Sequence, residues 1–226
     1  MEKTLSERLF EHYCQSKGIA CRKIPEADTS TPDYELAIEG RRIVVEVKEI
    51  DRNKEEQESD RLLRQRGYGN AESSTPGDRV RAKIDKSSAQ IKVRTVGIHP
   101  SILVLFDFGP AYRHLHPYQI RVAMYGLEQV YIALPPLGSG QPHVTGMGYG
   151  PKRKMTHEHN NSISAIGVLF TPGPDEIGLH VYHNKFAEVA LDTGLLAKYG
   201  INQFKLEDEI VGTTANWREV VPSKES

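Results

Sequence analysis

The chain has 226 residues, of which 38% are hydrophobic, and its 29 basic and 30 acidic side chains give a formal charge of -1. This length suits one large domain or two small ones, and the charge balance excludes a strongly cationic protein, so any site for a polyanion must be a local patch. Only Cys14 and Cys21 are present, too few for a disulfide scaffold. No apolar run approaches the roughly 18 residues of a membrane span, and the first residues lack the apolar core of a signal peptide, so we expect a cytoplasmic protein.

The beginning of the chain predicts a helix followed by three strands. The helix should start near Thr4 or Ser6, either of which can cap it, and end before Gly18. A weak strand follows at 19–24. Residues 34–38 alternate between apolar and polar side chains, Glu39-Gly40 is a turn signal, and 42–50 is a strand rich in β-branched residues, so 34–50 predicts a β-hairpin.

The middle of the chain predicts alternating helices and strands. Residues 51–78 are polar, rich in both charges and without a clear period, which indicates a mobile insertion. Residues 79–94 have the pattern of an amphipathic helix, because Val80, Ile84 and Ile91 recur on one side. We then expect a buried strand at 101–107, a helix around 118–126 and a strand at 129–134.

The last part of the chain predicts a long loop and further strands. Proline, glycine, histidine and asparagine dominate residues 135–162, which indicates a loop. Apolar runs return at 163–170 and 178–183. We therefore expect one α/β domain with a central mixed sheet flanked by helices, its core at about 5–135 and an extension at 136–226 packed on that core.

The most informative segment is Asp33 followed by Glu46 and Lys48. Residues two apart on a strand share a face, so Glu46 and Lys48 project to the same side of an otherwise apolar strand. Burying an isolated charge costs several kcal/mol, so the two need partners, a metal or solvent in a cleft. If 34–50 is a hairpin, Asp33 can approach Glu46, and the two carboxylates form a hard-oxygen site for a cation.

This pattern resembles the PD-(D/E)xK nuclease superfamily, the restriction-endonuclease-like fold, with Pro32-Asp33 as the first half of the motif and Glu46-Val47-Lys48 as the second. In many members a helix before the motif donates a glutamate about eleven residues ahead of a helix-ending glycine, and Glu7 and Gly18 fit that spacing. A helix after the motif commonly offers a glutamine, which Gln90 matches. The last third is similar to segments of uncharacterised bacterial proteins with this fold.

The resemblance implies a chemistry for these residues. In the family, the acidic residues hold one or two Mg²⁺ ions, for which Mn²⁺ can substitute, and here Asp33, Glu46 and Glu7 would be the ligands. Glu11, one turn after Glu7, could replace it as a ligand. Lys48 would orient the attacking water and stabilise charge on the phosphate.

Positive charge gathers in two segments that could contact a phosphate backbone. Arg79, Lys83, Lys86 and Gln90 recur at spacings of four, three and four, which places them along one side of the helix at 79–94. The second segment is Lys152-Arg153-Lys154. Each can instead be an ordinary solvated surface.

Two alternatives stay open for the remaining histidines and for the charged motif. His157 with His159, or His180 with His183, could suggest zinc, but no cysteine or third ligand stands at a recognised spacing. The simpler interpretation is that His157 and the asparagines after it hydrogen-bond a loop near the cleft. The motif itself could be a surface hairpin with an ordinary ion pair, worth about 0–1 kcal/mol.

We expect a Mg²⁺-dependent endonuclease acting on phosphodiester bonds, with DNA as the substrate by resemblance and RNA as another possibility. A catalytically inactive nuclease-fold protein that binds or scaffolds is the rival from a different class, and the presence of Asp33, Glu46 and Lys48 weighs against it. A homodimer would suit the cutting of two antiparallel strands.

Overall fold

A computed structural model of the chain describes residues 3–25, 31–50, 54–67, 75–107, 115–136, 138–173, 176–207 and 216–221. In chain order its elements are α1 (Leu5–Ser16), β1 (Ala20–Lys23), β2 (Tyr34–Ile38), β3 (Arg41–Ile50), α2 (Lys54–Arg66), α3 (Asp78–Thr95), β4 (Ser101–Asp107), α4 (Pro117–Tyr125), β5 (Glu128–Ala133), β6 (His143–Tyr149), β7 (Ala165–Gly173), β8 (Glu176–His183), α5 (Thr193–Ala197), β9 (Asn202–Leu206) and β10 (Trp217–Glu219).

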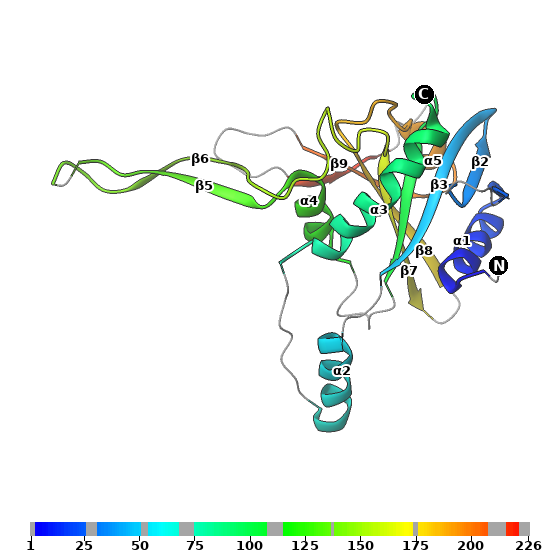
Figure 1. Ribbon diagram of the computed structural model, residues 1–226, viewed down its shortest axis with the longest axis horizontal. Coiled ribbons are helices and arrows are strands. Elements are labelled where there is room, and N and C mark those ends of the chain that lie inside the picture. The colour runs from blue at the N-terminus through cyan, green and yellow to red at the C-terminus, as the bar shows by residue number, and fades with distance from the viewer. Residues whose placement is uncertain are drawn as a thin grey trace.

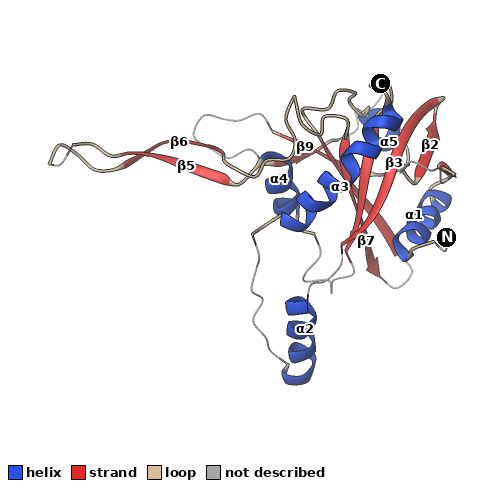
Figure 2. Ribbon diagram, in the orientation of Figure 1, coloured by secondary structure: helices blue, strands red, loops and turns tan. Residues whose placement is uncertain are grey.

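The described strands form a mixed eight-stranded sheet in the order β1-β2-β3-β4-β7-β8-β9-β10 and a separate two-stranded pair, β5 with β6. Helices lie on both sides of the large sheet (Figure 1), and Figure 2 separates helices from strands by colour. The predicted α/β class with a central mixed sheet is therefore confirmed.

The first helix and the hairpin form where the sequence predicts them. Thr4 caps α1, because its side chain accepts a hydrogen bond from the Glu7 amide at 3.3 Å, while its own amide donates to the Glu7 carboxylate at 2.7 Å. β2 and β3 pair antiparallel. Their turn residues, Glu39 and Gly40, have φ values of 51° and 74°, the left-handed conformation that tight hairpin turns require.

The centre of the sheet is parallel and buried on both faces. β3 pairs in parallel with β4, and β4 with β7, so helices must connect them across the sheet. One core contains Phe10 of α1 and Leu195 of α5. The other core contains Ile84 of α3 and Ile120 of α4. α1 and α5 therefore cover one face of the sheet, and α3 and α4 cover the other.

The last part of the chain completes the same sheet. β7 lies between β4 and β8, and β9 and β10 extend the sheet to its edge. The strand predictions at 163–170 and 178–183 are confirmed by β7 and β8. α5, β9 and β10 span at most five residues each, too few for a periodic pattern to show in the sequence.

The segment predicted as a mobile insertion at 51–78 contains a helix that was not anticipated from the sequence, α2 at Lys54–Arg66. This segment is rich in residues of high helix propensity, and Arg61 Nε donates to Glu58 Oε2 at 2.8 Å within one turn. α2 stands away from the sheet in Figure 1, so it needs no continuous apolar stripe, and no clear period appears in the sequence. Residues 51–53 and 68–74 lie outside the described part.

Two expectations change at the β5-β6 arm. The predicted strand at 129–134 exists as β5, but it is not in the central sheet, and the loop expected at 135–162 contains β6. The two strands project from the body as a long arm (Figure 1). A Cβ at Gly148 would come within 3.2 Å of the Tyr131 ring, so glycine lets this ring lie close to β6. Glycines also weaken the strand pattern in the sequence, which is why a loop is expected at β6.

Among the described helices, none is long and apolar enough to cross a bilayer.

Candidate active site

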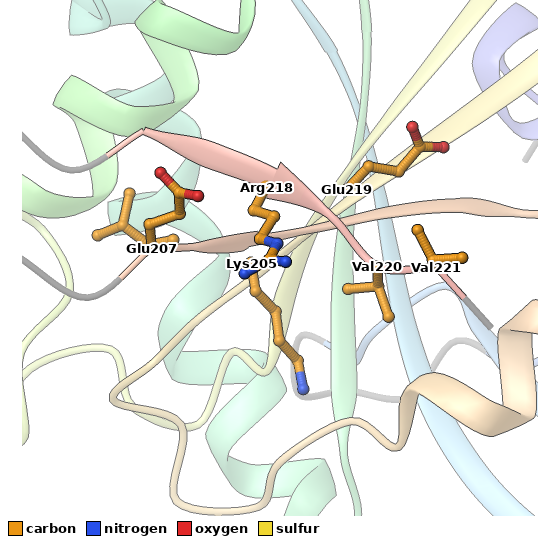
Figure 3. Close-up of a pocket in the computed structure, with 7 residues that line it drawn as sticks. Lys205, Glu207, Arg218, Glu219, Val220 and Val221 are labelled. Carbon is orange, nitrogen blue, oxygen red and sulfur yellow. The ribbon is translucent and has the colours of Figure 1, made fainter. Parts of the chain in front are cut away.

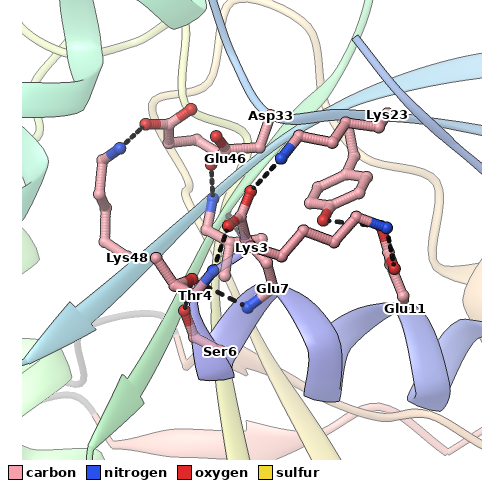
Figure 4. A network of polar contacts seen from close by, with 11 residues as sticks. Lys3, Thr4, Ser6, Glu7, Glu11, Lys23, Asp33, Glu46 and Lys48 are labelled. Atoms are coloured by element: carbon pink, nitrogen blue, oxygen red, sulfur yellow. Dashed lines mark hydrogen bonds and ion pairs between the residues drawn. The ribbon is translucent and has the colours of Figure 1, made fainter. Parts of the chain in front are cut away.

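The hairpin brings Asp33 and Glu46 together. Tyr34 lies opposite Val45 in the antiparallel register, so Asp33, immediately before β2, comes opposite Glu46, and both side chains belong to the same face of the sheet. Asp33 Oδ2 accepts a hydrogen bond from the Val47 amide at 2.8 Å, which holds the carboxylate at the end of the strand. Figure 4 shows the two carboxylates side by side.

Glu46 is a fully buried carboxylate with 0% exposure. Lys48, two residues further along β3, forms an ion pair with Glu46 Oε1. Despite that contact, neither Glu46 oxygen has a hydrogen-bond partner of acceptable geometry among the described residues. Burying a carboxylate costs several kcal/mol unless its charge is compensated, and in the described structure Lys48 is the one cation that forms an ion pair with Glu46.

The titration of the two acids reflects this environment. Burial and, to a smaller extent, the charge of Asp33 raise the pKa of Glu46 to about 7, although Lys48 acts in the other direction. Burial also raises the pKa of Asp33, although the hydrogen bond from Val47 and the charge of Lys48 act in the other direction. A bound cation would stabilise the charged forms of both acids, which the protein alone disfavours.

Glu7 joins the same polar network but is held by other partners. Its Oε1 accepts from Lys23 Nζ at 2.8 Å, and its Oε2 accepts from the Thr4 amide (Figure 4). Burial raises the pKa of Glu7, but these bonds outweigh burial and leave the pKa below its ordinary value. Its charge contributes to the raised pKa of Asp33, so the two are near neighbours. Even so, no three acidic, histidine or cysteine residues in the described ranges are arranged to hold one ion.

α3 covers the face of the sheet that carries Glu46. Ile50, on the same face of β3, packs in one core with Ile84 and Ile91 of α3. Between these two isoleucines lie Ser87, which is fully buried and whose hydroxyl has no hydrogen-bond partner among the described residues, and Gln90, which is half-buried. The predicted position of Gln90 on the helix after the motif thus falls on the helix above the candidate site.

The predicted basic residues of α3 differ in their surroundings. Arg79 Nη2 lies 3.3 Å from Asp107 Oδ2 at the end of β4. Lys83 is half-buried, and Lys86 is exposed. The ion pair of Arg79 ties α3 to β4, so Lys86 is the side chain of the predicted stripe that stands most clearly in solvent.

The second predicted basic segment lies against α3. Lys154 Nζ is 2.5 Å from Asp85 Oδ2, and Lys152 Nζ is 3.8 Å from Asp78 Oδ2. Arg153 Nη2 donates to the Tyr149 carbonyl at 2.8 Å. The fold therefore brings the two basic segments together, while the acids of α3 offset part of their charge.

One charged group was not anticipated from the sequence. Glu35, on the same face of β2 as Asp33, accepts hydrogen bonds from Arg22, Arg42 and Arg94. The alternation of the hairpin could have placed Glu35 on that face. Its partners come from β1, β3 and α3, and a pattern within one element does not reveal contacts between elements.

Three of the four histidines considered as zinc ligands make contacts with other side chains. His183 Nε2 lies 3.0 Å from Gln203 Oε1, and the His180 ring packs between Phe170 and Phe204. The His157 ring packs on Phe186. Asn160 and Asn161 donate to the carbonyls of Lys154 and His157, so the simpler interpretation is confirmed for the two asparagines.

A hollow at β9 and β10 lies far from the candidate site. Lys205, Glu207, Arg218 and Glu219 line it, and Figure 3 shows their charged groups around its mouth. β4, β7 and β8 separate β9 from β3 in the sheet. At about 4.8 Å between strands, the hollow is roughly 19 Å from the motif.

No family model matches this chain, and no curated protein or solved structure is significantly similar to it.

Proposed function

We propose that the chain is a metal-dependent nuclease that hydrolyses phosphodiester bonds, with DNA as the substrate and with Asp33, Glu46 and Lys48 in the active site. The observation that carries this proposal is Glu46, a fully buried carboxylate without hydrogen bonds opposite a second carboxylate. A fold gains nothing in stability from such a group. Its retention makes sense if the group binds something.

The residues fit a Mg²⁺ ion. Glu46 offers two oxygens that lack hydrogen bonds, and Asp33 is anchored beside it by the Val47 amide. Proteins commonly hold Mg²⁺ with one or two carboxylates, while the ion keeps several waters and takes further oxygens from a substrate phosphate. Two acids therefore suffice, and Glu7 acts on Asp33 through its charge. When bound, Mg²⁺ or Mn²⁺ would offset the charge that develops on the phosphate.

Lys48 is placed to act on water and phosphate. Its side chain is 33% exposed, so its ammonium lies at the boundary between the buried acids and solvent. Its ammonium forms an ion pair with Glu46, and its charge lowers the pKa of Asp33. From this position the ammonium can orient an attacking water and stabilise negative charge on the phosphate oxygens.

The restriction-endonuclease-like fold is part of the proposal. α1 precedes the motif and carries Glu7, the β2-β3 hairpin carries the motif, and α3 follows with Gln90 on the helix over the same face. These relations support the resemblance in the predicted core at 5–135. The resemblance in turn supplies the preference for DNA and for endonucleolytic cutting.

A plasmid-nicking assay tests the function. Supercoiled DNA is incubated with the protein and Mg²⁺ or Mn²⁺, beside a single-stranded RNA substrate. Asp33→Asn and Glu46→Gln should each lower cleavage at least about 100-fold, because several kcal/mol of transition-state stabilisation depend on the charged site. Glu49→Gln is the matched control, since Glu49 is next to Lys48 on the opposite face, where it accepts from the Ser6 amide at 3.0 Å.

The outcomes separate the alternatives. Normal cleavage by folded Asp33→Asn and Glu46→Gln proteins would overturn the site. DNA binding without cleavage under any metal condition would favour the inactive binding module instead. Cleavage of RNA alone would keep the hydrolytic site and replace the substrate.

A further inference from the structure

Three arginines converge on one buried glutamate beside the candidate site. Glu35 Oε2 accepts from Arg22 Nη2 at 2.7 Å, and Glu35 Oε1 accepts from Arg94 Nη2 at 2.5 Å and from Arg42. The side chain of Glu35 is only 8% exposed. We refer to Glu35, Arg22, Arg42 and Arg94 as the Glu35 cluster.

The Glu35 cluster carries more positive charge than its structural role needs. One arginine would suffice to neutralise the glutamate, and the other two leave an excess charge of two. In the described ranges, Glu35 is the one carboxylate that pairs with any of the three arginines. Like charges gathered around one carboxylate repel one another, so a further anion would relieve that repulsion.

Donors remain available in the Glu35 cluster. Arg42 Nε has no hydrogen-bond partner among the described residues, but it is buried, so an anion would meet the exposed parts of the Arg42 and Arg22 side chains. The Arg22 side chain is 76% exposed, so most of its guanidinium faces solvent. A hollow of about 400 Å³ lies at this edge of the sheet and is lined by Arg22, Glu35 and Arg42 together with residues of β1 and the hairpin turn. An anion can therefore reach the arginines.

The Glu35 cluster lies two residues along the strands from the proposed metal ligands. Glu35 follows Asp33 by two residues on the same face and lies opposite Val44, two residues before Glu46. Two residues of a strand span roughly 7 Å. With an axial rise of about 3.4 Å per nucleotide, a nucleic-acid strand covers that distance in about two nucleotides.

We infer that the Glu35 cluster binds a backbone phosphate of the nucleic acid close to the phosphate that is cut. This inference rests on the proposed function and names a contact that fixes the strand on its site. Guanidinium groups suit the role, because their planar array of donors matches two phosphate oxygens at once. The contact reads no sequence, so it contributes to affinity and position.

Arg22→Gln is the cleanest test, because this exposed side chain can be changed without opening the core. Arg218→Gln is the matched control: it removes the same charge from an exposed residue at the opposite edge of the sheet, at the hollow of Figure 3. Binding of a fluorescent duplex is measured by anisotropy over a series of salt concentrations in EDTA, which prevents cleavage. Loss of one phosphate contact should weaken binding about eightfold at 0.1 M salt and reduce the salt slope by about 0.9.

Each outcome decides a different point. The inference would be overturned if the Arg22→Gln protein bound DNA with the same affinity and salt slope as the wild-type protein. If the wild-type protein also cut DNA, the proposed function would remain intact. If DNA affinity fell in Arg22→Gln but not in Arg218→Gln, and the wild-type protein cleaved no DNA, the phosphate contact would be supported and the nuclease proposal overturned. Absence of all nucleic-acid binding by the wild-type protein would overturn the inference.

A second arm separates a nucleic-acid contact from a site for small anions. Inorganic phosphate is added at millimolar concentration, and thermal unfolding is recorded for wild-type, Arg22→Gln and Arg22→Lys proteins. Phosphate stabilisation that Arg22→Gln abolishes, together with unchanged DNA affinity, would make the cluster a small-anion site and contradict the inference. Arg22→Lys keeps the charge, so it should retain more DNA affinity than Arg22→Gln does.

Discussion

Glu46 and Glu35 lie on neighbouring strands of one hairpin, on the same face, yet their environments are opposite. Glu46 is fully buried and neither of its oxygens has a hydrogen-bond partner in the described structure, whereas Glu35 accepts from three arginines. Burial raises the pKa of Glu46 to about 7. Burial acts the same way on Glu35, but the arginines outweigh it and hold the pKa below its ordinary value.

The difference in hydrogen bonding between Glu35 and Glu46 indicates two different roles for a buried carboxylate. Glu35 ties β1, β2, β3 and α3 together, because its partners come from elements far apart in the chain. Glu46 ties nothing together except its neighbour Lys48. The charge of Glu46 is compensated only by the partly exposed Lys48, and a poorly compensated buried charge costs stability. We therefore expect the same Glu-to-Gln change to have opposite effects at the two positions.

The largest effect should come from Glu35→Gln. This substitution leaves three arginines around a neutral amide, and one of them has a buried, unpartnered Nε. We expect the free energy of unfolding to fall by about 3 kcal/mol, the usual cost of breaking a buried ion pair from one side. Urea denaturation at pH 7 measures the change. A loss below about 1 kcal/mol would mean that the cluster contributes little to the fold.

The second-largest effect should come from His183, a buried ionisable group far from Glu35 and Glu46. His183 of β8 is 6% exposed and bonds to Gln203. Burial lowers the pKa of His183 to about 4, although the bond to Gln203 opposes the shift. Between about pH 6.5, where unfolded histidine titrates, and pH 4, the unfolded state binds more protons, so stability falls as the pH falls.

His183→Gln removes this titration while keeping a polar partner for Gln203. The wild-type protein should lose about 2 kcal/mol more than His183→Gln between pH 7 and pH 5, measured by urea denaturation at both values. Cleavage at neutral pH should be unchanged, because His183 is remote from Asp33 in the sheet. Parallel stability curves for the two proteins would show that His183 titrates normally.

The smallest effect should have the opposite sign. Glu46→Gln replaces a buried charge without hydrogen bonds by a neutral group of the same size, and Lys48 can turn to solvent because it is partly exposed. We expect the free energy of unfolding to rise by about 1 kcal/mol in EDTA at pH 8, while cleavage is lost. Destabilisation as large as that of Glu35→Gln would remove the contrast between the two acids and the main support for the site.

Much of the hairpin and of the flanking helices could be predicted from local patterns. The cap at Thr4 and the β-branched run of β3 involve residues close in sequence, and so does the apolar side of α3, where Val80, Ile84 and Ile91 are buried. Such patterns report local geometry directly. The place of β5 could not be predicted in the same way, because a strand pattern does not reveal which strand will pair with it.

The sequence by itself determined that Glu46 and Lys48 share one side of a strand and that Asp33 stands at the start of its partner strand, since strand periodicity and a tight turn decide both. Only the tertiary structure decided which of these charges are compensated. Arg94 reaches Glu35 across 59 positions of sequence, whereas no arginine in the described structure pairs with Glu46. The physical reason is that the solvation and pairing of a buried charge depend on every element packed around it, and those elements meet only when the sheet and its helices assemble.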